Sequence, residues 1–486
     1  MTFNSWEFLL FYPVVLLLYF LLPKKFKWPM LLIASYYFYM CYRAELVVLI
    51  FGTTLISWVA SNIIEKSSKP AVRKLWLAFT LVSCLGVLFF YKYFNFFSES
   101  VAGLIGYFGG TPSPVSLNLI LPVGISFYTF QTLSYVIDVY RSEIKSEKNF
   151  FFYALFVSFF PQLVAGPIER PGNLIPQLKE PKKANKADAI KGAKHMIVGF
   201  FKKVAVADLL SLYVGEVYND VGSATAYGVI IATILFAVQI YCDFSGYTDI
   251  AIGCARVMGI RLMKNFDHPY SATTIKEFWG RWHISLSQWF KDYLYIPLGG
   301  NRCKRVRRLF NIFVVFLVSG LWHGAAWTFV IWGALHGVYQ IVGNLTIKSR
   351  NRALGILKLS EKSLPVVIFR RLSVFILVCF SWLFFRANSI SDAISLLQTL
   401  FVSGFEVSLS DTLASMNLDL TAILSCIVSI MTLFIIDRVL KYEDCDDGSD
   451  LLLKNGSFIY FIWIIMFTWA ILLSQDIGST FIYFQF

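Results

Sequence analysis

One histidine of this chain stands among residues that rarely carry a charge. His323 lies within residues 310–342, which are otherwise almost wholly apolar. Moving an imidazole out of water without a hydrogen-bond partner is costly, so ionisable side chains inside apolar spans mark functional sites by default. A neutral imidazole in such a place can take a proton from a hydroxyl group, as a general base does. The structural alternative is a ring that links two helices through hydrogen bonds.

A second group of polar side chains lies upstream, in residues 278–300. This segment combines Arg281 and His283 with several tryptophans, so it is too polar to face lipid along its whole length and too aromatic for a plain solvated loop. We interpret it as an interfacial or re-entrant helix that closes a polar cavity. Of the five histidines in the chain, His283 lies in this segment and His323 and His336 lie in the nearby residues 310–342, whereas His195 and His268 lie outside both.

The composition decides what kind of protein carries these residues. Of 486 residues, 57% are hydrophobic and only 15% are charged, and the mean hydropathy is +0.63. Apolar runs of about 20 residues, the length that spans a bilayer, recur from end to end. This excludes a soluble globular protein and predicts an all-α, polytopic membrane protein with a single domain, residues 1–486. Residues 8–22 lack a preceding basic region and a following cleavage site, so we expect an uncleaved first span.

The net charge of +13 does not require a polyanionic partner. The basic residues concentrate in a few loops between apolar runs, as membrane orientation demands, and no nucleic-acid partner is indicated. The eight cysteines form no CxxC pair and lie mostly inside apolar runs, so they predict neither a disulfide framework nor a zinc site. No metal ligand set is expected.

Apolar runs and helix-breaking residues together predict the helices. The expected ranges are 6–22, 29–43, 45–64, 74–97, 117–140, 150–165, 189–213, 227–258, 276–295, 309–345, 365–386, 417–440 and 457–474. The basic loops are 24–27, 66–74, 179–203, 302–308 and 348–362, and the positive-inside rule assigns all of them to the cytoplasm.

These loops constrain the segment around His323. Residues 309–345 have basic residues on both flanks and would be too long for one crossing, so we expect this segment to enter the membrane and return. The pairs Gly320/Gly324 and Gly333/Gly337 provide faces for close packing of such helices. His323 would then lie deep in the membrane. We interpret His336 as a supporting or packing residue, with a direct role left open.

Three further charges need an explanation. Asp243 and Asp249 lie in the apolar segment 227–258, and Arg281 precedes His283. We expect an ion-pair network that holds helices together, because charges inside membranes commonly pair. The clusters Lys202/Lys203 and 302–308 either meet the phosphates of a donor or serve orientation alone.

Several motifs, taken together and in this order, resemble one family. They are Trp322-His323-Gly324 with Trp327-Thr328-Phe329, Trp332-Gly333-Ala334-Leu335-His336-Gly337, Arg281-Trp282-His283-Ile284-Ser285-Leu286-Ser287, Asp292-Tyr293-Leu294-Tyr295-Ile296-Pro297-Leu298-Gly299-Gly300, Asp243-Phe244-Ser245-Gly246-Tyr247-Thr248-Asp249, Ala165-Gly166-Pro167-Ile168 and the terminal Phe481-Ile482-Tyr483-Phe484-Gln485-Phe486. The chain resembles the membrane-bound O-acyltransferases over nearly its whole length. Within that family it is similar to the bacterial branch that O-acetylates alginate or peptidoglycan.

The resemblance implies a ring of helices around a central partition, where a cytoplasmic tunnel for an acyl thioester meets an outer funnel for the acceptor. It assigns the catalytic histidine to His323 and the second catalytic position to His283, with His336, Trp322, Asp243 and Arg281 as supporting residues. It further implies a bacterial inner-membrane location and, as donor, acetyl-CoA or another acyl thioester, with no permanently bound cofactor. The partners would be membrane lipid, a polysaccharide acceptor and a separate extracytoplasmic protein with a serine-hydrolase (SGNH, esterase-like) domain, because this chain has no such domain.

The chemistry of thioesters fits these residues. A thioester is already activated, so transfer to a hydroxyl needs chiefly a base and a dry, oriented site. We expect His323 to be the base, and His283 either to orient a reacting group by hydrogen bonding or to stabilise charge on the thioester oxygen. A covalent acyl-histidine relay is a less economical alternative.

Two other functions stay open. The teichoic-acid D-alanylation subunit belongs to the same superfamily and would receive its acyl group from a carrier protein. A membrane transporter would also carry intramembrane charges, but its usual half-repeats are not evident in this sequence. Neighbouring genes would separate the two acyl donors, since a carrier protein favours D-alanine and an esterase-like partner favours acetate.

Overall fold

The computed structural model describes residues 1–180, 185–402, 404–443, 468 and 481–482. These residues form helices and connecting segments without a β-strand, which confirms the predicted all-α class. They divide into two compact units, residues 1–196 with 250–264, and residues 197–249 with 265–486. The expectation that the whole chain is one domain stays a prediction.

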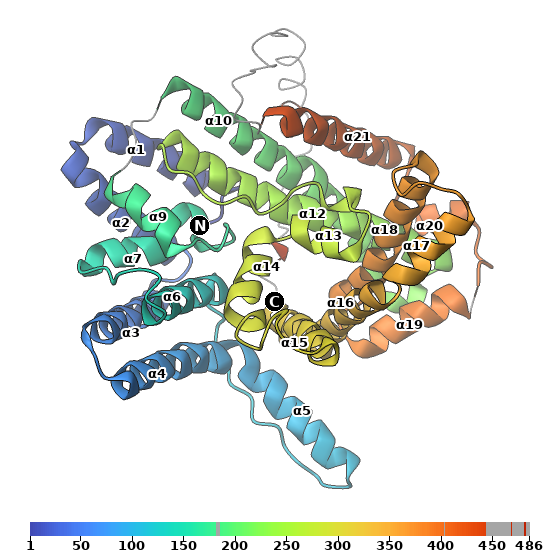
Figure 1. Cartoon of the computed structure of the whole chain (residues 1–486). Helices are drawn as coiled ribbons and strands as arrows, with labels where there is room; N and C mark the ends of the chain where they lie inside the picture. Colours follow the sequence, from blue (N-terminus) through green and yellow to red (C-terminus); the bar gives the residue numbers. More distant parts are fainter. Residues whose placement is uncertain (181–184, 403, 444–467, 469–480, 483–486) are drawn as a thin grey trace. The chain divides into compact units, whose positions relative to one another are not determined.

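The first unit is built from short and long helices of the N-terminal part. These are α1 (Trp6–Leu21), α2 (Lys24–Met40), η1 (Ala44–Leu46), α3 (Val47–Lys66), α4 (Pro70–Leu88), η2 (Phe89–Tyr93), α5 (Phe94–Tyr107), α6 (Ile125–Tyr140), α7 (Phe150–Ser158), α8 (Phe160–Leu163), α9 (Pro171–Lys179), most of α10 (Lys186–Phe200) and the end of α12 (Ala226–Val257). Helices α3, α4 and α6 pack side by side (Figure 1).

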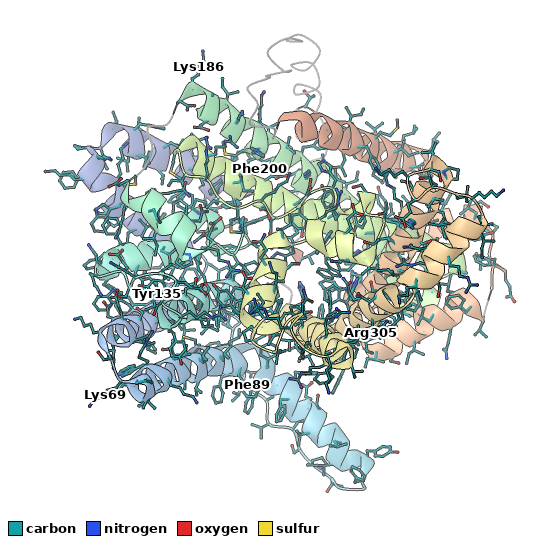
Figure 2. The ribbon with its side chains drawn as sticks, viewed as in Figure 1. Lys69, Phe89, Tyr135, Lys186, Phe200 and Arg305 are labelled. Carbon is teal, nitrogen blue, oxygen red and sulfur yellow. The ribbon has the colours of Figure 1, made fainter. Side chains whose placement is uncertain are left out.

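Aromatic side chains fill the interior of this unit. Tyr135 of α6 lies inside it and Lys69 at its edge (Figure 2). The Tyr135 and Tyr153 rings are 4.3 Å apart between centroids, and the Tyr153 hydroxyl lies 2.8 Å from Ser57 Oγ. The buried rings therefore satisfy their polar ends by hydrogen bonds, as buried tyrosines require.

The second unit holds the three histidines of interest. Its elements are η3 (Phe201–Asp208), α11 (Leu209–Tyr218), η4 (Val221–Ser223), most of α12, η5 (Pro269–Ser271), α13 (Ile275–Arg281), α14 (Ile284–Phe290), η6 (Lys291–Tyr295), α15 (Arg305–His323), α16 (Trp327–Leu345), α17 (Ile347–Ile356), α18 (Leu364–Arg386), α19 (Ile390–Phe401), α20 (Leu409–Ser415) and α21 (Leu420–Glu443).

Helices α15 and α16 form the expected hairpin (Figure 1). The chain turns at residues 324–326, and Gly320 of α15 faces Gly333 of α16. A Cβ atom on Gly320 would come within 2.3 Å of the Phe329 carbonyl oxygen, and one on Gly333 within 2.4 Å of the Phe316 carbonyl oxygen. The glycines thus allow the two backbones to approach closely, as at other membrane helix contacts. The predicted hairpin is confirmed, and its entry into the membrane and return stays a prediction.

Five described helices or continuous helical segments are long and apolar enough to cross a membrane. They are Ala44–Lys66, Pro70–Tyr107, Ala226–Val257, Arg305–His323 and Leu364–Arg386. A bent pair, Leu409–Ser415 with Leu420–Ile436, would make a sixth if it forms one broken span. These segments support the assignment to the membrane proteins.

Several predicted boundaries need correction. The range 117–140 begins only at Ile125, after Gly124 with its φ of +73°. The range 150–165 breaks at Phe159, because Pro161 lacks a backbone N–H and favours the first turn of a new helix. The short helices α9, α17, α19 and α20 were not expected, and α17 occupies much of the predicted basic loop 348–362. The predicted helix 457–474 lies outside the described residues, apart from residue 468.

The predicted basic loop 179–203 was also wrong at its C-terminal end. Helix α10 and the π-helical segment η3 continue through Lys202 and Lys203, which are both buried. Lys202 Nζ lies 2.9 Å from Asp249, and Lys203 Nζ lies 2.7 Å from Asp243 and 2.8 Å from Asp208. Because each ammonium group is paired inside the protein, neither belongs to a surface patch for donor phosphates.

Candidate active site

His283 occupies a break between two short helices. Helix α13 ends at Arg281, and α14 begins at Ile284. His283 lies between them with a backbone φ of +44°. This is the left-handed region, which residues other than glycine rarely adopt. The Ile284 N–H donates to the Asn265 carbonyl oxygen at 2.9 Å and fixes this turn. The surrounding structure therefore imposes a strained backbone at the position of the second histidine, a feature common at functional sites.

The side chain of Asn265 determines which nitrogen of His283 carries a proton. Asn265 Oδ1 lies 3.0 Å from His283 Nδ1 and also accepts from the N–H and hydroxyl groups of Ser285 at 3.2 and 2.9 Å. An amide oxygen can only accept, so His283 Nδ1 must donate. The other nitrogen of the neutral ring, Nε2, then carries a lone pair and accepts hydrogen bonds.

Burial reinforces this neutral form. His283 is fully buried and lies outside the candidate spans. Its burial lowers the pKa of the imidazole, because a charged ring in this setting loses the solvation that water would give it. His283 is thus suited to accept a hydrogen bond at Nε2 while it stays neutral. In this tautomer it cannot donate to an oxyanion, which disfavours the charge-stabilising role that the sequence left open.

His323 is the last residue of α15 and lies in an aromatic enclosure. Its ring meets the Trp332 ring nearly edge to face at a centroid distance of 4.9 Å, and the Phe385 ring at 5.6 Å. Trp322 contacts both histidine rings, at 5.0 Å from His323 and 5.9 Å from His283. Only 3% of the His323 surface is exposed, so the enclosure keeps bulk water from the imidazole.

The structure brings His283 and His323 together, although they lie 40 positions apart in the sequence. Their ring centroids lie 6.4 Å apart, with the ring planes inclined at 58°. This spacing allows both rings to contact one carbonyl or hydroxyl group, directly or through a water molecule. The two residues that the sequence singled out for chemistry therefore share one location.

His336 does not join this pair. Trp279 Nε1–H donates to His336 Nδ1 at 3.2 Å, so Nε2 of the neutral ring carries the proton and donates to Ser381 Oγ at 3.0 Å. The ring also packs against Trp332, the residue that contacts His323. The two nitrogens of His336 thus link α16 to α13 and α18 by hydrogen bonds. Trp332 lies between His336 and His323 and contacts both rings.

The remaining predicted residues hold the surrounding elements. Arg281 pairs with Glu277 at 2.8 Å and donates to Ser271 Oγ and to the Asp267 carbonyl oxygen. Asp243 pairs with Lys203 and accepts from the Ile482 N–H at 2.7 Å. Asp243 thereby links α12 to η3 and to the C-terminal residues of the chain.

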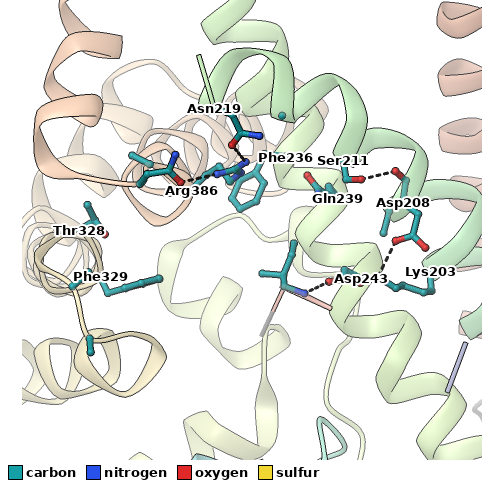
Figure 3. Close-up of a pocket in the computed structure, with 17 residues that line it drawn as sticks. Lys203, Asp208, Ser211, Asn219, Phe236, Gln239, Asp243, Thr328, Phe329 and Arg386 are labelled. Atoms are coloured by element: carbon teal, nitrogen blue, oxygen red, sulfur yellow. Dashed lines mark hydrogen bonds and ion pairs between the residues drawn. The ribbon is translucent and has the colours of Figure 1, made fainter. Parts of the chain in front are cut away.

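A cavity of about 540 Å³ opens beside the hairpin turn (Figure 3). Its walls come from η3, α11, α12, α16 and the end of α18, and the lining residues include Lys203, Asp243, Gln239, Arg386 and Thr328. Neither His283 nor His323 lines it. Phe329 does, and its ring contacts Phe385 at 4.9 Å, which in turn contacts His323. One aromatic layer therefore separates the cavity from His323.

Sequence reasoning missed Asn265, Gln239 and Arg386. Asn265 stands in a polar connector without any recognisable spacing to His283. Gln239 is a single polar residue within a long apolar helix, and Arg386 resembles the many arginines that end membrane spans. Only the fold shows what these three side chains adjoin.

Comparisons with known proteins identify the family of the chain. The family model of the membrane-bound O-acyltransferases matches residues 140–385, which include both His283 and His323. The chain is 38% identical over 407 residues to the probable alginate O-acetylase AlgI of Pseudomonas aeruginosa PAO1, covering 83% of this chain and 75% of that protein. It is 34% identical over 421 residues to the peptidoglycan O-acetyltransferase of Helicobacter pylori 26695, with 80% and 77% covered.

A more distant match concerns a different acyl group. The teichoic acid D-alanyltransferase of Bacillus subtilis 168 is 30% identical over 236 residues, which cover 47% of this chain and 60% of that protein. Together these matches show that the chain belongs to the membrane-bound O-acyltransferase family. The protein is an O-acyltransferase embedded in a membrane.

Proposed function

We propose that the protein takes acetyl groups from acetyl-CoA on the cytoplasmic side of a bacterial inner membrane and passes them outward for O-acetylation of an extracytoplasmic polysaccharide. The observation that carries this proposal is the buried pair His283 and His323, with ring centroids 6.4 Å apart. The similarity to the alginate and peptidoglycan O-acetylating proteins over most of the chain supports acetate as the acyl group and a polysaccharide as the final acceptor.

In this reaction one proton passes from the acceptor to the leaving group through His323. The acceptor hydroxyl attacks the thioester carbonyl carbon, a C–O bond forms and the C–S bond breaks. His323 takes the hydroxyl proton and returns it to the leaving thiolate, so that the thiol departs and the imidazole is neutral again. His283 orients a reacting group through its Nε2 lone pair, which Asn265 keeps available. The aromatic enclosure limits competing hydrolysis of the thioester by excluding water.

The cavity supports an acceptor site on the outer side. Helices α15 and α18 both begin beside segments whose basic residues predict a cytoplasmic location. Their other ends, at His323 and Arg386, are then directed away from the cytoplasm. An acceptor entering the cavity would reach the Phe329 and Phe385 layer next to His323. A separate esterase-like protein would complete transfer to the polymer.

A reconstituted transfer assay tests this function. Membranes containing the protein are supplied with acetyl-labelled CoA on the cytoplasmic face, and label is measured in a polysaccharide and an esterase-like partner on the other face. We expect transfer that requires the protein and is lost with His323→Gln at equal protein amount. Label that never leaves CoA, or transfer that His323→Gln does not lower, would refute the proposal.

D-alanyl transfer is the second candidate, supported by the partial match to the Bacillus subtilis protein. The same assay distinguishes it when D-alanine on a carrier protein replaces acetyl-CoA. Transfer of D-alanine, together with no transfer of acetate, would favour this alternative.

A further inference from the structure

The connection between α16 and α18 contains an exposed helix that the proposed reaction does not use. Residues 346–363 form this connection, which is longer than the roughly 2–8 residues that usually join neighbouring helices (Figure 1). Its helix α17 is exposed at every residue except Leu354, which is partly buried. Large apolar side chains are among those exposed, with exposed fractions of 49% for Ile347, 73% for Ile356 and 63% for Leu357. Water alone is therefore an unfavourable surrounding for this helix.

The basic and the apolar residues of α17 lie on different sides of the helix. At 3.6 residues per turn, Lys348 and Arg352 are four positions apart and share one side. Ile347 and Leu354 are seven positions apart and share another side, about 100–160° away around the helix axis. Helix α17 is therefore amphipathic.

The basic charges of this connection are not balanced within the protein. One acidic residue, Glu361, stands against five basic residues, which gives a net charge of +4; the basic residues are Lys348, Arg350, Arg352, Lys358 and Lys362. Glu361 is already engaged, because it pairs with Arg370 of α18 at 3.6 Å and accepts from the Asn351 amide, oriented as a donor, at 3.0 Å. Within the part of the chain that the structure describes, none of the five basic residues has a carboxylate at ion-pair distance.

Membrane orientation explains these charges but leaves the apolar side unexplained. The positive-inside rule predicts that residues 348–362 are cytoplasmic, and it requires neither a helix nor exposed apolar side chains. The basic segment 66–74 provides a comparison, because α3 and α4 are joined there by only Ser67, Ser68 and Lys69, without an apolar side chain. A helix with one basic and one apolar side is typical of segments that lie in the plane of a membrane surface.

We propose that α17 lies in the boundary between membrane and water and binds anionic phospholipids, with their phosphates on Lys348 and Arg352 and its apolar side chains among the acyl chains. Lysine and arginine donate charge-assisted hydrogen bonds to phosphate oxygens, and basic clusters beside membrane spans attract anionic headgroups. This surface does not depend on which acyl group the protein transfers. Because α17 joins the helix of Trp332 to the helix of Phe385, bound lipid fixes the connection between two helices that enclose His323.

Lipid titration of the whole protein tests the inference. The purified protein in detergent is titrated with phosphatidylglycerol and, separately, with phosphatidylcholine of the same acyl chains, and bound lipid is measured by native mass spectrometry. We expect phosphatidylglycerol to bind roughly tenfold more tightly or better, because each basic residue near an anionic headgroup contributes to the affinity. Added salt should reduce this preference. Equal affinity for the two lipids would overturn the proposal.

Two charge-matched double variants locate the site. Lys348→Gln combined with Arg352→Gln should lower the affinity for phosphatidylglycerol roughly tenfold and leave the affinity for phosphatidylcholine unchanged. Lys66→Gln combined with Lys69→Gln removes the same charge from another basic segment, so the affinity for phosphatidylglycerol should stay as in the natural protein. Equal losses in the two double variants would show a response to net charge alone and refute the site.

A third double variant tests the apolar side. Ile356→Ser combined with Leu357→Ser keeps every charge, and both side chains are exposed, so the fold does not depend on them. The affinity for phosphatidylglycerol should fall, because less apolar surface is buried among the acyl chains. Unchanged affinity would contradict insertion of α17 at the membrane surface.

Coenzyme A is the competing anionic occupant, since it also carries phosphates. Its affinity is compared between the natural protein and the variant with Lys348→Gln and Arg352→Gln, and we expect no difference. Equal losses of affinity for coenzyme A and for phosphatidylglycerol would assign the basic side of α17 to the donor substrate and reject the lipid.

Discussion

The side-chain oxygen of Asn265 lies 3.0 Å from Nδ1 of His283, and the same oxygen accepts two hydrogen bonds from Ser285. This contact makes Nδ1 the donor and leaves Nε2 as an acceptor, on a ring whose centroid lies 6.4 Å from that of His323. Asn265 touches neither substrate in this account. It acts as a positioning residue through the tautomer of His283, and this role can be tested separately from folding.

Replacing Asn265 with alanine should lower kcat with little change in KM for the thioester, because the orientation of His283 is lost while the donor site is intact. The expected loss is roughly ten- to a hundredfold, the equivalent of one or two buried hydrogen bonds. Steady-state kinetics in membranes measures it. Asn301→Ala is the matched control, since that amide accepts a hydrogen bond from the Tyr295 hydroxyl at an exposed position. Equal effects of both substitutions would contradict the positioning role.

Asn265→Asp should introduce a pH dependence. A carboxylate beside Nδ1 stabilises the imidazolium and raises the pKa of His283, opposing the lowering by burial. At neutral pH a larger fraction of His283 is then protonated, and its Nε2 becomes a donor. Activity should therefore fall relative to the natural protein and recover as the pH rises through the raised pKa. A pH–rate profile parallel to that of the natural protein would argue against control by this tautomer.

His336 should matter for stability more than for chemistry. His336→Ala leaves the Trp279 indole N–H and the Ser381 hydroxyl with fewer partners in a buried location, at a cost of about 1–3 kcal/mol for each group left unsatisfied. We expect a lower unfolding temperature in detergent and only a modest fall in kcat for the protein that remains folded. If the folded fraction loses as much activity as a His323 variant, His336 has a direct catalytic role.

The glycine contact in the α15 and α16 hairpin predicts a sharp difference between two glycines of α16. Gly333→Ala adds a Cβ atom that would come within 2.4 Å of a backbone oxygen, whereas Gly343 has nothing within 4 Å of the corresponding position. Overpacking of this kind costs about 1–3 kcal/mol. Thermal unfolding should thus shift downward for Gly333→Ala and stay unchanged for Gly343→Ala. Equal stability of the two variants would show that the hairpin can open at low cost.

Much of this architecture could be predicted from local patterns. Basic residues on both flanks of 309–345, together with the glycine pairs, predicted the hairpin, because both patterns follow directly from membrane topology and backbone approach. The importance of His323 followed from the cost of an ionisable group in an apolar span. The membrane class followed from composition alone.

The finer features depend on tertiary contacts that leave no periodic signal. The break at His283 depends on the Asn265 backbone and side chain, 18 positions earlier in the sequence. Lys202 and Lys203 were assigned to a loop because lysines usually mark the cytoplasmic side of a membrane protein. Only their carboxylate partners explain why both side chains are buried. That Gln239 and Arg386 line one cavity becomes visible only when α12 and α18 are placed beside it.

The central claim is that His283 and His323 act together on one acyl transfer, and a double-mutant cycle tests it most directly. His323→Ala should lower kcat/KM by roughly two to four orders of magnitude, the range for loss of a general base, in protein that is folded and inserted. Residues that act as a unit lose activity non-additively, so the variant with both His323→Ala and His283→Ala should be little worse than His323→Ala alone. Losses that multiply fully in the double variant would contradict the account and assign His283 to a separate step.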